Sequence, residues 1–299
     1  MPTPTSGLNK VIKRFFYGVR NSGFVYQNII NQKQVSLYKK LSRGASLSEL
    51  QYKIVSGLKS DGIAISSFNE LFPNLDFNNY LSWIQDNETN LVNKKKKKFL
   101  YSYYGTEDSN KPIDLQNPFI QFYLSESLLE IVSTYLGYLP QLFEVYVEKT
   151  VPIGDSEPQF SQNWHRDPEE KRTLKVFMYL NDVDENCGPF TYIKKSQPTS
   201  NNSYSKLFKQ ELPWGSYPSE AKVNFKTDPK EHFVATGKKG TIIFCDTAGL
   251  HRGGYAKNGA RIMSTGFFPS FHYTEPRLFK SPSSQELIPL GNYAKAVLA

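Results

Sequence analysis

The first half of the chain carries apolar residues three and four positions apart, a spacing that places them on one face of a helix. The predicted helices cover residues 8–20, 46–58, 77–91 and 128–136. Ser46, three residues before Glu49, predicts a capping box at the start of the second helix. Gly62 and Gly137 are expected to end the second and the last of them, because glycine readily takes the left-handed conformation of a helix C-terminus.

After Pro140 the pattern changes to short apolar or alternating runs separated by turn residues, which is typical of strands. The predicted strands cover residues 142–151, 173–180, 190–193, 240–245 and 261–268, with a short one at 63–65. Residues 101–117 show no clear period and are expected to be irregular. Helices followed by antiparallel-type strands indicate an α+β fold, with a β-sandwich or barrel in the C-terminal half and helices outside it.

The 299-residue chain is long enough for one large core. We expect a single domain over residues 46–299, with its helices in 46–140 and its core strands in 141–270. Residues 1–45 are expected to form a basic appendage that includes the first helix. The interval 196–233 interrupts the strands, and a loop of this length inside a compact domain predicts a lid over a substrate.

The net charge of +8 is concentrated at the N-terminus: residues 1–60 contain ten lysines and arginines against one acid, Glu49, while the rest is nearly balanced. Three interpretations of the basic amphipathic helix at 8–20 stay open. It packs on the body, it contacts an anionic surface such as a membrane or a polyanion, or it is a cleavable transit peptide. The lysine run 94–98 is interpreted as a solvated loop or helix end, and a nucleic-acid role is not favoured.

Secretion and membrane insertion find no support in the sequence. The two cysteines, Cys187 and Cys245, make no disulfide framework. No apolar run reaches the roughly 18 residues that a membrane span needs. We therefore expect a cytoplasmic protein, with peripheral contact at a membrane surface through residues 8–20 as the open alternative.

The candidate chemistry begins at His165 and Asp167, which share one face of an extended strand and can reach one metal ion. A third ligand is sought among the other histidines. His251 follows a strongly apolar strand and precedes Arg261 by ten residues, whereas His232 and His272 have no such surroundings.

Two histidines and one carboxylate bind Fe(II) through one face and leave positions open for a 2-oxoacid and dioxygen. Arg261 suits the far carboxylate of 2-oxoglutarate, because guanidinium binds carboxylate through two parallel hydrogen bonds. Zinc could use the same ligands. The arginine and the strand scaffold favour oxidative chemistry.

The spacing between His251 and Arg261 raises a geometric problem. Asn258-Gly259 is typical of a two-residue hairpin, which would place Arg261 opposite Ala256. The arginine and His251 would then face opposite sides of the sheet, about 16 Å apart along the strand. We therefore predict a loose loop over residues 254–259.

Three stretches together resemble the phytanoyl-CoA dioxygenase family of iron(II)/2-oxoglutarate oxygenases. They are residues 163–167 (Asn-Trp-His-Arg-Asp), 180–190, with its acidic-Asn-Cys-Gly-Pro segment, and 246–254. The helix ends around Leu58–Ile63 and Tyr135–Gly137 are similar as well, so the resemblance covers about residues 50–275.

The resemblance implies a double-stranded β-helix (jelly roll, cupin-like), with His165, Asp167 and His251 as iron ligands and Arg261 as the 2-oxoglutarate anchor. It departs from the family in two places: the His-to-Arg spacing is one residue short of the common pattern, and residues 194–197 replace the usual Ser-His ending of the Gly-Pro turn.

Gln162 and Tyr146 are further co-substrate contacts to test, with ordinary strand residues as the equal alternative. Since related halogenases replace the carboxylate by a small residue, Asp167 favours hydroxylation.

The expected activity is hydroxylation of an unactivated C–H bond, with dioxygen consumed and 2-oxoglutarate converted to succinate and CO2. The expected substrate is a small molecule or a lipid- or sugar-linked compound, and an anionic one is favoured. The alternatives are a 2-oxoglutarate oxygenase that modifies nucleic acid, suggested by the N-terminal charge, and a non-catalytic jelly-roll binding protein.

Overall fold

The computed structural model describes residues 23–44, 46–88, 95–106, 108–154, 157–167, 170, 172–199, 217–273 and 275–299. The predicted helix at 8–20 and residues 200–216 of the predicted lid lie outside these ranges. None of the described helices combines the length and the apolarity that a bilayer crossing requires. The cytoplasmic location and the surface contact of residues 8–20 stay predictions.

The described helices, which include the π-helix η1 and the 3-10 helices η3 and η4, are α2 (Gly23–Val25), η1 (Tyr26–Ile30), α3 (Gln32–Leu41), α4 (Glu49–Asp61), α5 (Phe68–Leu71), α6 (Asn78–Asn87), α7 (Pro118–Tyr123), α8 (Glu126–Leu136), η3 (Phe160–Gln162), α10 (Glu220–Lys226), η4 (Pro229–Glu231), α11 (Ser284–Leu287) and α12 (Asn292–Leu298). The strands are β1 (Ile63–Ser67), β2 (Lys95–Lys97), β3 (Leu100–Gly105), β4 (Asp108–Pro112), β5 (Glu144–Thr150), β6 (Leu174–Tyr179), β7 (Phe190–Ile193), β8 (His232–Ala235), β9 (Thr241–Asp246), β10 (His251–Arg252), β11 (Arg261–Phe268) and β12 (Phe279–Lys280).

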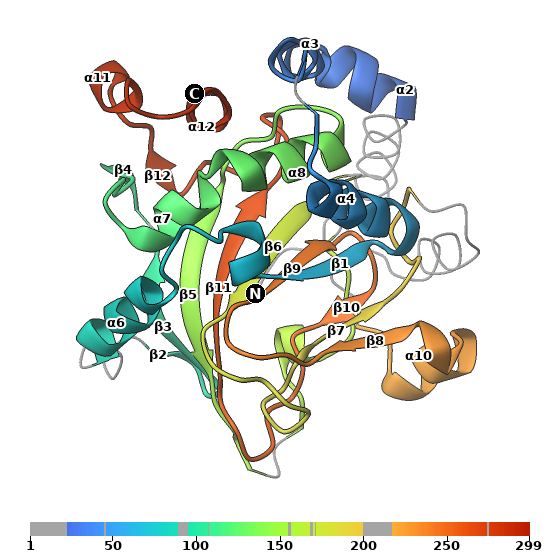
Figure 1. Ribbon diagram of the computed structural model, residues 1–299. Coiled ribbons are helices and arrows are strands. Elements are labelled where there is room, and N and C mark those ends of the chain that lie inside the picture. The colour runs from blue at the N-terminus through green and yellow to red at the C-terminus, as the bar shows by residue number, and fades with distance from the viewer. Residues whose placement is uncertain are drawn as a thin grey trace, which may run out of the picture.

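The strands form a large antiparallel sheet in the order β1-β9-β6-β11-β5-β3-β2 and a small one in the order β10-β7-β8 (Figure 1). A parallel pair, β12-β4, lies apart from both. The α+β prediction is confirmed. So are the five predicted core strands, each within two residues of its expected limits.

The two sheets face each other across a buried apolar cluster. The large sheet contributes Phe177 and Ile243 to it, and the small sheet contributes Phe190 and Tyr192. Side chains of a strand alternate between faces, so the same strands present a second set of residues to the opposite side. Lys175 lies on the same face of β6 as Phe177, so its side chain is enclosed between the two sheets.

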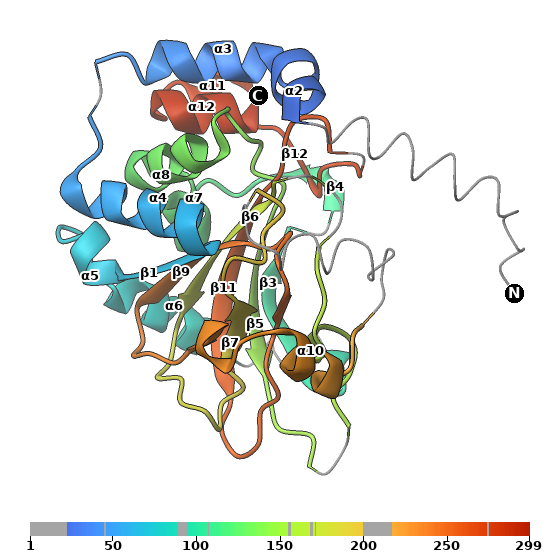
Figure 2. The ribbon, with the colours of Figure 1, turned by 90° about the vertical axis from the view of Figure 1, so that its right-hand side faces the viewer.

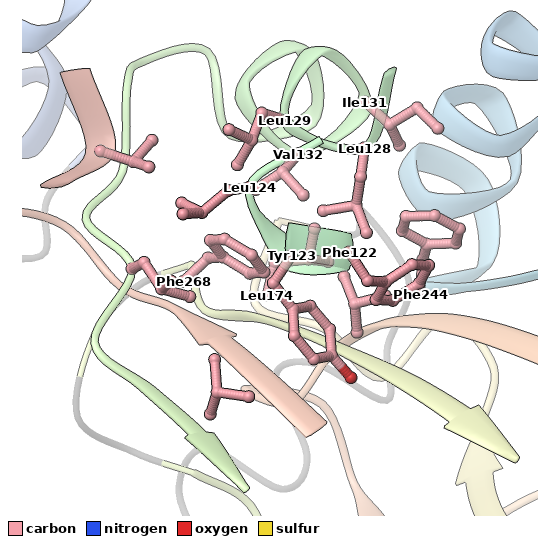
Figure 3. Close-up of a cluster of buried hydrophobic side chains, with 14 of the residues drawn as sticks. Phe122, Tyr123, Leu124, Leu128, Leu129, Ile131, Val132, Leu174, Phe244 and Phe268 are labelled. Atoms are coloured by element: carbon pink, nitrogen blue, oxygen red, sulfur yellow. The ribbon is translucent and has the colours of Figure 1, made fainter. Parts of the chain in front are cut away.

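The other face of the large sheet is covered by helices. Figure 3 shows side chains of α7 and α8 packed against residues of β6, β9 and β11, among them Leu174, Phe244 and Phe268. Figure 2 shows α4 and α8 over the sheet, with α3 and α12 in a further layer. This helical layer leaves the opposite face of the sheet for the site.

Helix boundaries confirm part of the predicted capping. Gly62 (φ +80°) and Gly137 (φ +77°) end α4 and α8 in the left-handed conformation, as predicted. The capping box at Ser46 is wrong, because the side chain that accepts the hydrogen bond from Gln51 N is that of Ser48. The N-cap of α4 therefore lies two residues later than expected.

Residues 101–117 contain β3 and β4, so the prediction of an irregular stretch is wrong. The pairing of β3 with β5 shifts register between Ser102 and Tyr104. Such an irregularity breaks the two-residue period on which strand recognition depends.

The N-terminal element η1 packs on the body through a buried carboxylate. Tyr26 is 3% exposed and belongs to the main core. Its hydroxyl donates to Oε2 of Glu170 at 3.2 Å. The same carboxylate accepts from Ser270 N at 2.7 Å and from Ser270 Oγ at 2.6 Å. Glu170 thus ties residues of the predicted appendage to the chain segment that follows β11.

A second buried acid, Asp246, predicts a pH dependence of stability. Its carboxylate accepts from the Tyr135 hydroxyl at 2.5 Å and from Ala248 N at 3.1 Å, but burial raises its pKa to about 6. A raised carboxyl pKa favours the folded state below the unfolded pKa, and this stability is lost as the pH rises through the folded pKa.

The free energy of unfolding of Asp246→Asn is therefore expected to rise relative to that of the natural protein as the pH rises from about 4 to about 6. The relative gain reaches up to about 3 kcal/mol, because the amide does not ionise. Urea unfolding midpoints of both proteins at pH 4 and pH 7 test this. Parallel pH profiles would show that Asp246 does not change protonation in that window.

Candidate metal centre

His165 and His251 are held side by side by a backbone bridge between their own residues. His165 N donates to His251 O at 2.8 Å, and His251 N donates to His165 O at 2.9 Å. Residues paired directly across antiparallel strands project their side chains to the same side. The two imidazole centroids lie 4.2 Å apart.

Both rings are oriented by the same local hydrogen bond. Nδ1 of His165 lies 2.9 Å from the carbonyl oxygen of Asn163, and Nδ1 of His251 lies 3.0 Å from that of Gly249. A carbonyl accepts only, so each Nδ1 carries the proton and each Nε2 keeps a lone pair for a metal.

Asp167 completes the triad. Its backbone N donates to Thr247 O at 2.9 Å, which fixes the residue beside the strand end. Its Oδ1 lies 3.9 Å from Nε2 of His165, and its Oδ2 lies 3.9 Å from Nε2 of His251. Ligand atoms of all three residues lie within 4.8 Å of one another, as one metal ion requires.

The protonation states suit metal binding. Burial, reinforced by the neighbouring His165, lowers the pKa of His251 to about 3, and burial also lowers the pKa of His165. Burial alone would raise the pKa of Asp167, but Lys175 and the two imidazoles hold it well below its ordinary value. Near neutral pH the site offers two neutral imidazoles and one carboxylate.

Lys175 belongs to this site and was missed by the sequence analysis. Its Nζ donates to Asp167 Oδ2 at 2.8 Å. Burial would lower the pKa of this ammonium group, but Asp167 raises it well above its ordinary value, so the group is charged. The signal was a single lysine within the apolar strand β6, in line with Phe177 and Tyr179 on the face toward the small sheet.

Arg261 lies in the same enclosed space, together with His165, His251 and Lys175, where they line a cavity of about 120 Å³. The arginine is 5% exposed, and its Nη1 donates to Gly188 O at 2.6 Å. Its Nε has no hydrogen-bond partner among the residues that the structure describes.

The register problem is resolved because no hairpin joins His251 to Arg261. His251 lies in β10 of the small sheet and Arg261 in β11 of the large sheet, so the two residues face the cavity from different sheets. Residues 253–260 carry the chain between the sheets as a loop, as predicted.

The loop between the sheets depends on close backbone contact with the Gly-Pro segment. Gly254 has φ +69°, and a Cβ there would lie 2.1 Å from Pro189 O. Gly188 also has φ +69°, and its Cβ would lie 2.7 Å from Ala256 N. These contacts explain why both segments carry glycine at these positions.

The two further candidate residues also line the 120 Å³ cavity. Gln162 is 3% exposed, and its Oε1 accepts from Gln159 N at 2.9 Å. Its Nε2 has no hydrogen-bond partner within the described ranges. Tyr146 projects from β5, and burial raises the pKa of its phenol. All six predicted site residues are thus brought together around one point between the sheets.

A second polar cluster anchors α10 beside the metal centre. Trp164 Nε1 donates to Glu220 Oε2 at 2.8 Å, and Arg252 pairs with the same carboxylate. The Arg252 guanidinium lies 4.5 Å from the Trp164 ring centroid. This cluster places Tyr217, just before α10, with its ring 6.0 Å from that of His165. Tyr217, which belongs to the predicted lid interval 196–233, therefore lies close to the candidate metal centre.

No protein-family model and no curated protein matches the sequence. Solved structures resemble the fold. EctD from S. alaskensis with 2-oxoglutarate and 5-hydroxyectoine has a TM-score of 0.51 and 16% identity, covering 77% of this chain and 78% of that one. EctD from S. alaskensis with bound Fe has a TM-score of 0.50 and 14% identity, covering 80% of this chain and 83% of that one. HygX from Streptomyces hygroscopicus with nickel and 2-oxoglutarate has a TM-score of 0.47 and 17% identity, covering 76% of this chain and 88% of that one. This chain therefore shares the fold of EctD.

Proposed function

We propose that this protein is an Fe(II)- and 2-oxoglutarate-dependent dioxygenase that hydroxylates an unactivated C–H bond of a small organic substrate. The observation that carries the proposal is the convergence of His165, Asp167 and His251 beside a cavity that also holds the buried Arg261. Metal ligands and a buried cation in one cavity fit a metal-chelating anion better than a structural metal site.

The donor set fits the metal. Two neutral imidazoles with defined tautomers and one carboxylate bind Fe(II) on one face and leave the other positions for exchangeable ligands. Lys175 holds the second oxygen of Asp167, so the carboxylate is oriented before a metal arrives. Hydrogen bonds to metal ligands set ligand orientation in this way.

The cavity fits the co-substrate. Arg261 Nε and Gln162 Nε2 are buried donors with no acceptor in the described part of the chain. A buried donor left without a partner costs about 1–3 kcal/mol, so both favour a ligand that brings acceptor oxygens. The distal carboxylate of 2-oxoglutarate would accept from Arg261, and Gln162 and Tyr146 would contact the same molecule.

When bound, iron and 2-oxoglutarate supply the oxidation: dioxygen is consumed, 2-oxoglutarate becomes succinate and CO2, and the substrate gains a hydroxyl. The protein binds and orients these groups. Phe190, with its ring 5.6 Å from that of His251, and Phe177, 4.8 Å from Phe190, supply an apolar wall that limits water near the metal. Since the third ligand is the carboxylate of Asp167, we expect hydroxylation and not halogenation.

We further assign the fold to the double-stranded β-helix class and the chain to the neighbourhood of the phytanoyl-CoA dioxygenase family. The facing antiparallel sheets support this, as does the chain that switches between them directly after His251. The Gly-Pro segment gains a specific role, because Gly188 provides the carbonyl that accepts from Arg261.

The test is succinate formation by the full chain with Fe(II), 2-oxoglutarate and dioxygen. Many such reactions proceed slowly without substrate, so we expect succinate that depends on Fe(II) and is lost on its replacement by Zn(II). Tight Zn(II) binding with no succinate under any condition, and no 2-oxoglutarate binding, would contradict the proposal and indicate a structural metal site.

A further inference from the structure

A second cavity, of about 340 Å³, adjoins the metal centre. Asp167 and Lys175 line it, and Lys175 also lines the smaller cavity that holds Arg261. The rest of its wall comes from the start of β5, the end of β11 and four residues beyond it, Tyr273, Glu275, Pro276 and Leu278. In the proposed enzyme, this is space beside the metal that the co-substrate does not need.

Three aromatic rings form one side of this cavity. Phe143 and Tyr273 meet edge to face with centroids 4.8 Å apart, and Phe267 lies 5.6 Å from each of them. The Nζ of Lys175 lies 5.1 Å from the centroid of Phe267. An ammonium group is thus already placed against this aromatic wall, where the ring face attracts positive charge.

The charged groups of the wall are mostly acidic. Asp167, Glu144 and Glu275 line the cavity with Lys175. Register places Phe267 opposite both Lys175 on β6 and Glu144 on β5, so acid, ring and ammonium follow one row across the sheet.

The loaded site would keep this excess of negative charge. The metal, Lys175 and Arg261 would face the carboxylate of Asp167 and both carboxylates of 2-oxoglutarate, and these charges offset one another to within one unit. Glu144 and Glu275 then add two negative charges at the aromatic wall. Of the possible substrate charges, a positive one complements this cavity best.

We propose that the 340 Å³ cavity binds a positively charged amino or alkylammonium group of the substrate against Phe143, Phe267 and Tyr273, with Glu144 and Glu275 as counter-charges. The inference rests on the proposed function and names the substrate class of that enzyme. It differs from the sequence-based expectation of an anionic substrate, for which Lys175 would be the contact, and the two have opposite experimental signatures.

The experiment uses the full chain loaded with Mn(II), a paramagnetic substitute for Fe(II), and saturated with 2-oxoglutarate without dioxygen. Three four-carbon probes are compared by ligand-observed NMR: n-butylammonium, n-butanol and butanesulfonate. Manganese-dependent relaxation of the probe protons reports binding beside the metal. We expect butylammonium to be relaxed about fivefold more than butanol, and butanesulfonate least.

Two acid-to-amide variants locate the effect. Glu275→Gln changes an exposed side chain of the cavity wall, and Glu144→Gln removes the second charge. Together they are expected to lower the butylammonium effect at least about threefold. Asp86→Asn is the matched control, because Asp86 is exposed on α6 and does not line the cavity.

Each other result overturns the inference. Equal relaxation of the three probes, stronger relaxation of butanesulfonate, or an undiminished effect in Glu144→Gln/Glu275→Gln would exclude a cation site while metal and 2-oxoglutarate binding persist. Failure of the protein to bind Mn(II) or 2-oxoglutarate would instead contradict the proposed function itself, and the inference with it.

Discussion

Asp167→Ala is expected to abolish metal binding and succinate formation together. The carboxylate supplies one of three ligands and the only negative charge among them. Loss of a residue that merely supports a ligand weakens metal binding about 10- to 100-fold, so loss of the ligand itself should cost more than about 100-fold. Metal titration by calorimetry and a succinate assay measure the two effects. His165→Ala and His251→Ala are expected to behave alike.

The lysine partner of Asp167 requires a control. Without the carboxylate, Lys175 would be a half-buried ammonium group lacking its 2.8 Å partner, which is itself destabilising. Asp167→Ala/Lys175→Met removes both charges and is expected to recover stability without recovering metal binding. Wild-type-like metal affinity in any folded variant of the triad would disprove the site.

Arg261 substitutions should act on the co-substrate and spare the metal. Arg261→Gln is expected to weaken 2-oxoglutarate binding about 10- to 100-fold, because a charge-assisted hydrogen bond contributes about 1.5–3 kcal/mol. Arg261→Lys keeps the charge but loses the two parallel hydrogen bonds of a guanidinium. Its affinity for 2-oxoglutarate should lie between those of the natural protein and Arg261→Gln. Titration of Mn(II)-loaded protein with 2-oxoglutarate, beside titration with Mn(II) alone, separates the two affinities.

Lys175 is the other cation in the cavity and provides the comparison for Arg261. If Lys175→Met weakens 2-oxoglutarate binding more than Arg261→Gln does, the anchor is the lysine and the assignment of Arg261 is wrong. Arg261 also donates to Gly188 O, so the thermal stability of each variant has to accompany its affinity.

The main elements could be predicted because burial imposes a period on the sequence. Strands β6 and β9 are buried on both faces, by helices on one side and by the small sheet on the other, and so appear as largely apolar runs. Strand β3 lies near the edge of its sheet and shifts register against β5. Residues 100–105 therefore show neither an apolar run nor a regular alternation.

The three candidate metal ligands could be proposed from the sequence because their spacing and surroundings are local features of the chain. The His-x-Asp spacing places two ligands on one side of the chain, and an apolar strand precedes the third. What could not be predicted was the relation between distant segments. The distance from His251 to Arg261 depends on a change of sheet, which no local turn pattern encodes.

Lys175 was missed for a related reason. A lysine is ordinarily exposed, and its burial here depends on Asp167, which reaches it only through tertiary structure. Its position in an apolar strand, in line with two aromatic residues that face the small sheet, was the available signal. The protonation states of the triad were likewise out of reach, since they follow from burial.

The carboxylate of Glu170 has a practical consequence for how the protein should be produced. Residues 1–45 resemble a dispensable basic leader, and truncation at residue 46 would be a natural choice for crystallisation. That cut would remove Tyr26 and leave Glu170 with one partner fewer beneath Ser270. Ser270 begins the segment that supplies Tyr273 and Glu275 to the second cavity. A shortened protein is therefore expected to bind metal normally but to differ from the full chain in which compounds bind in the second cavity.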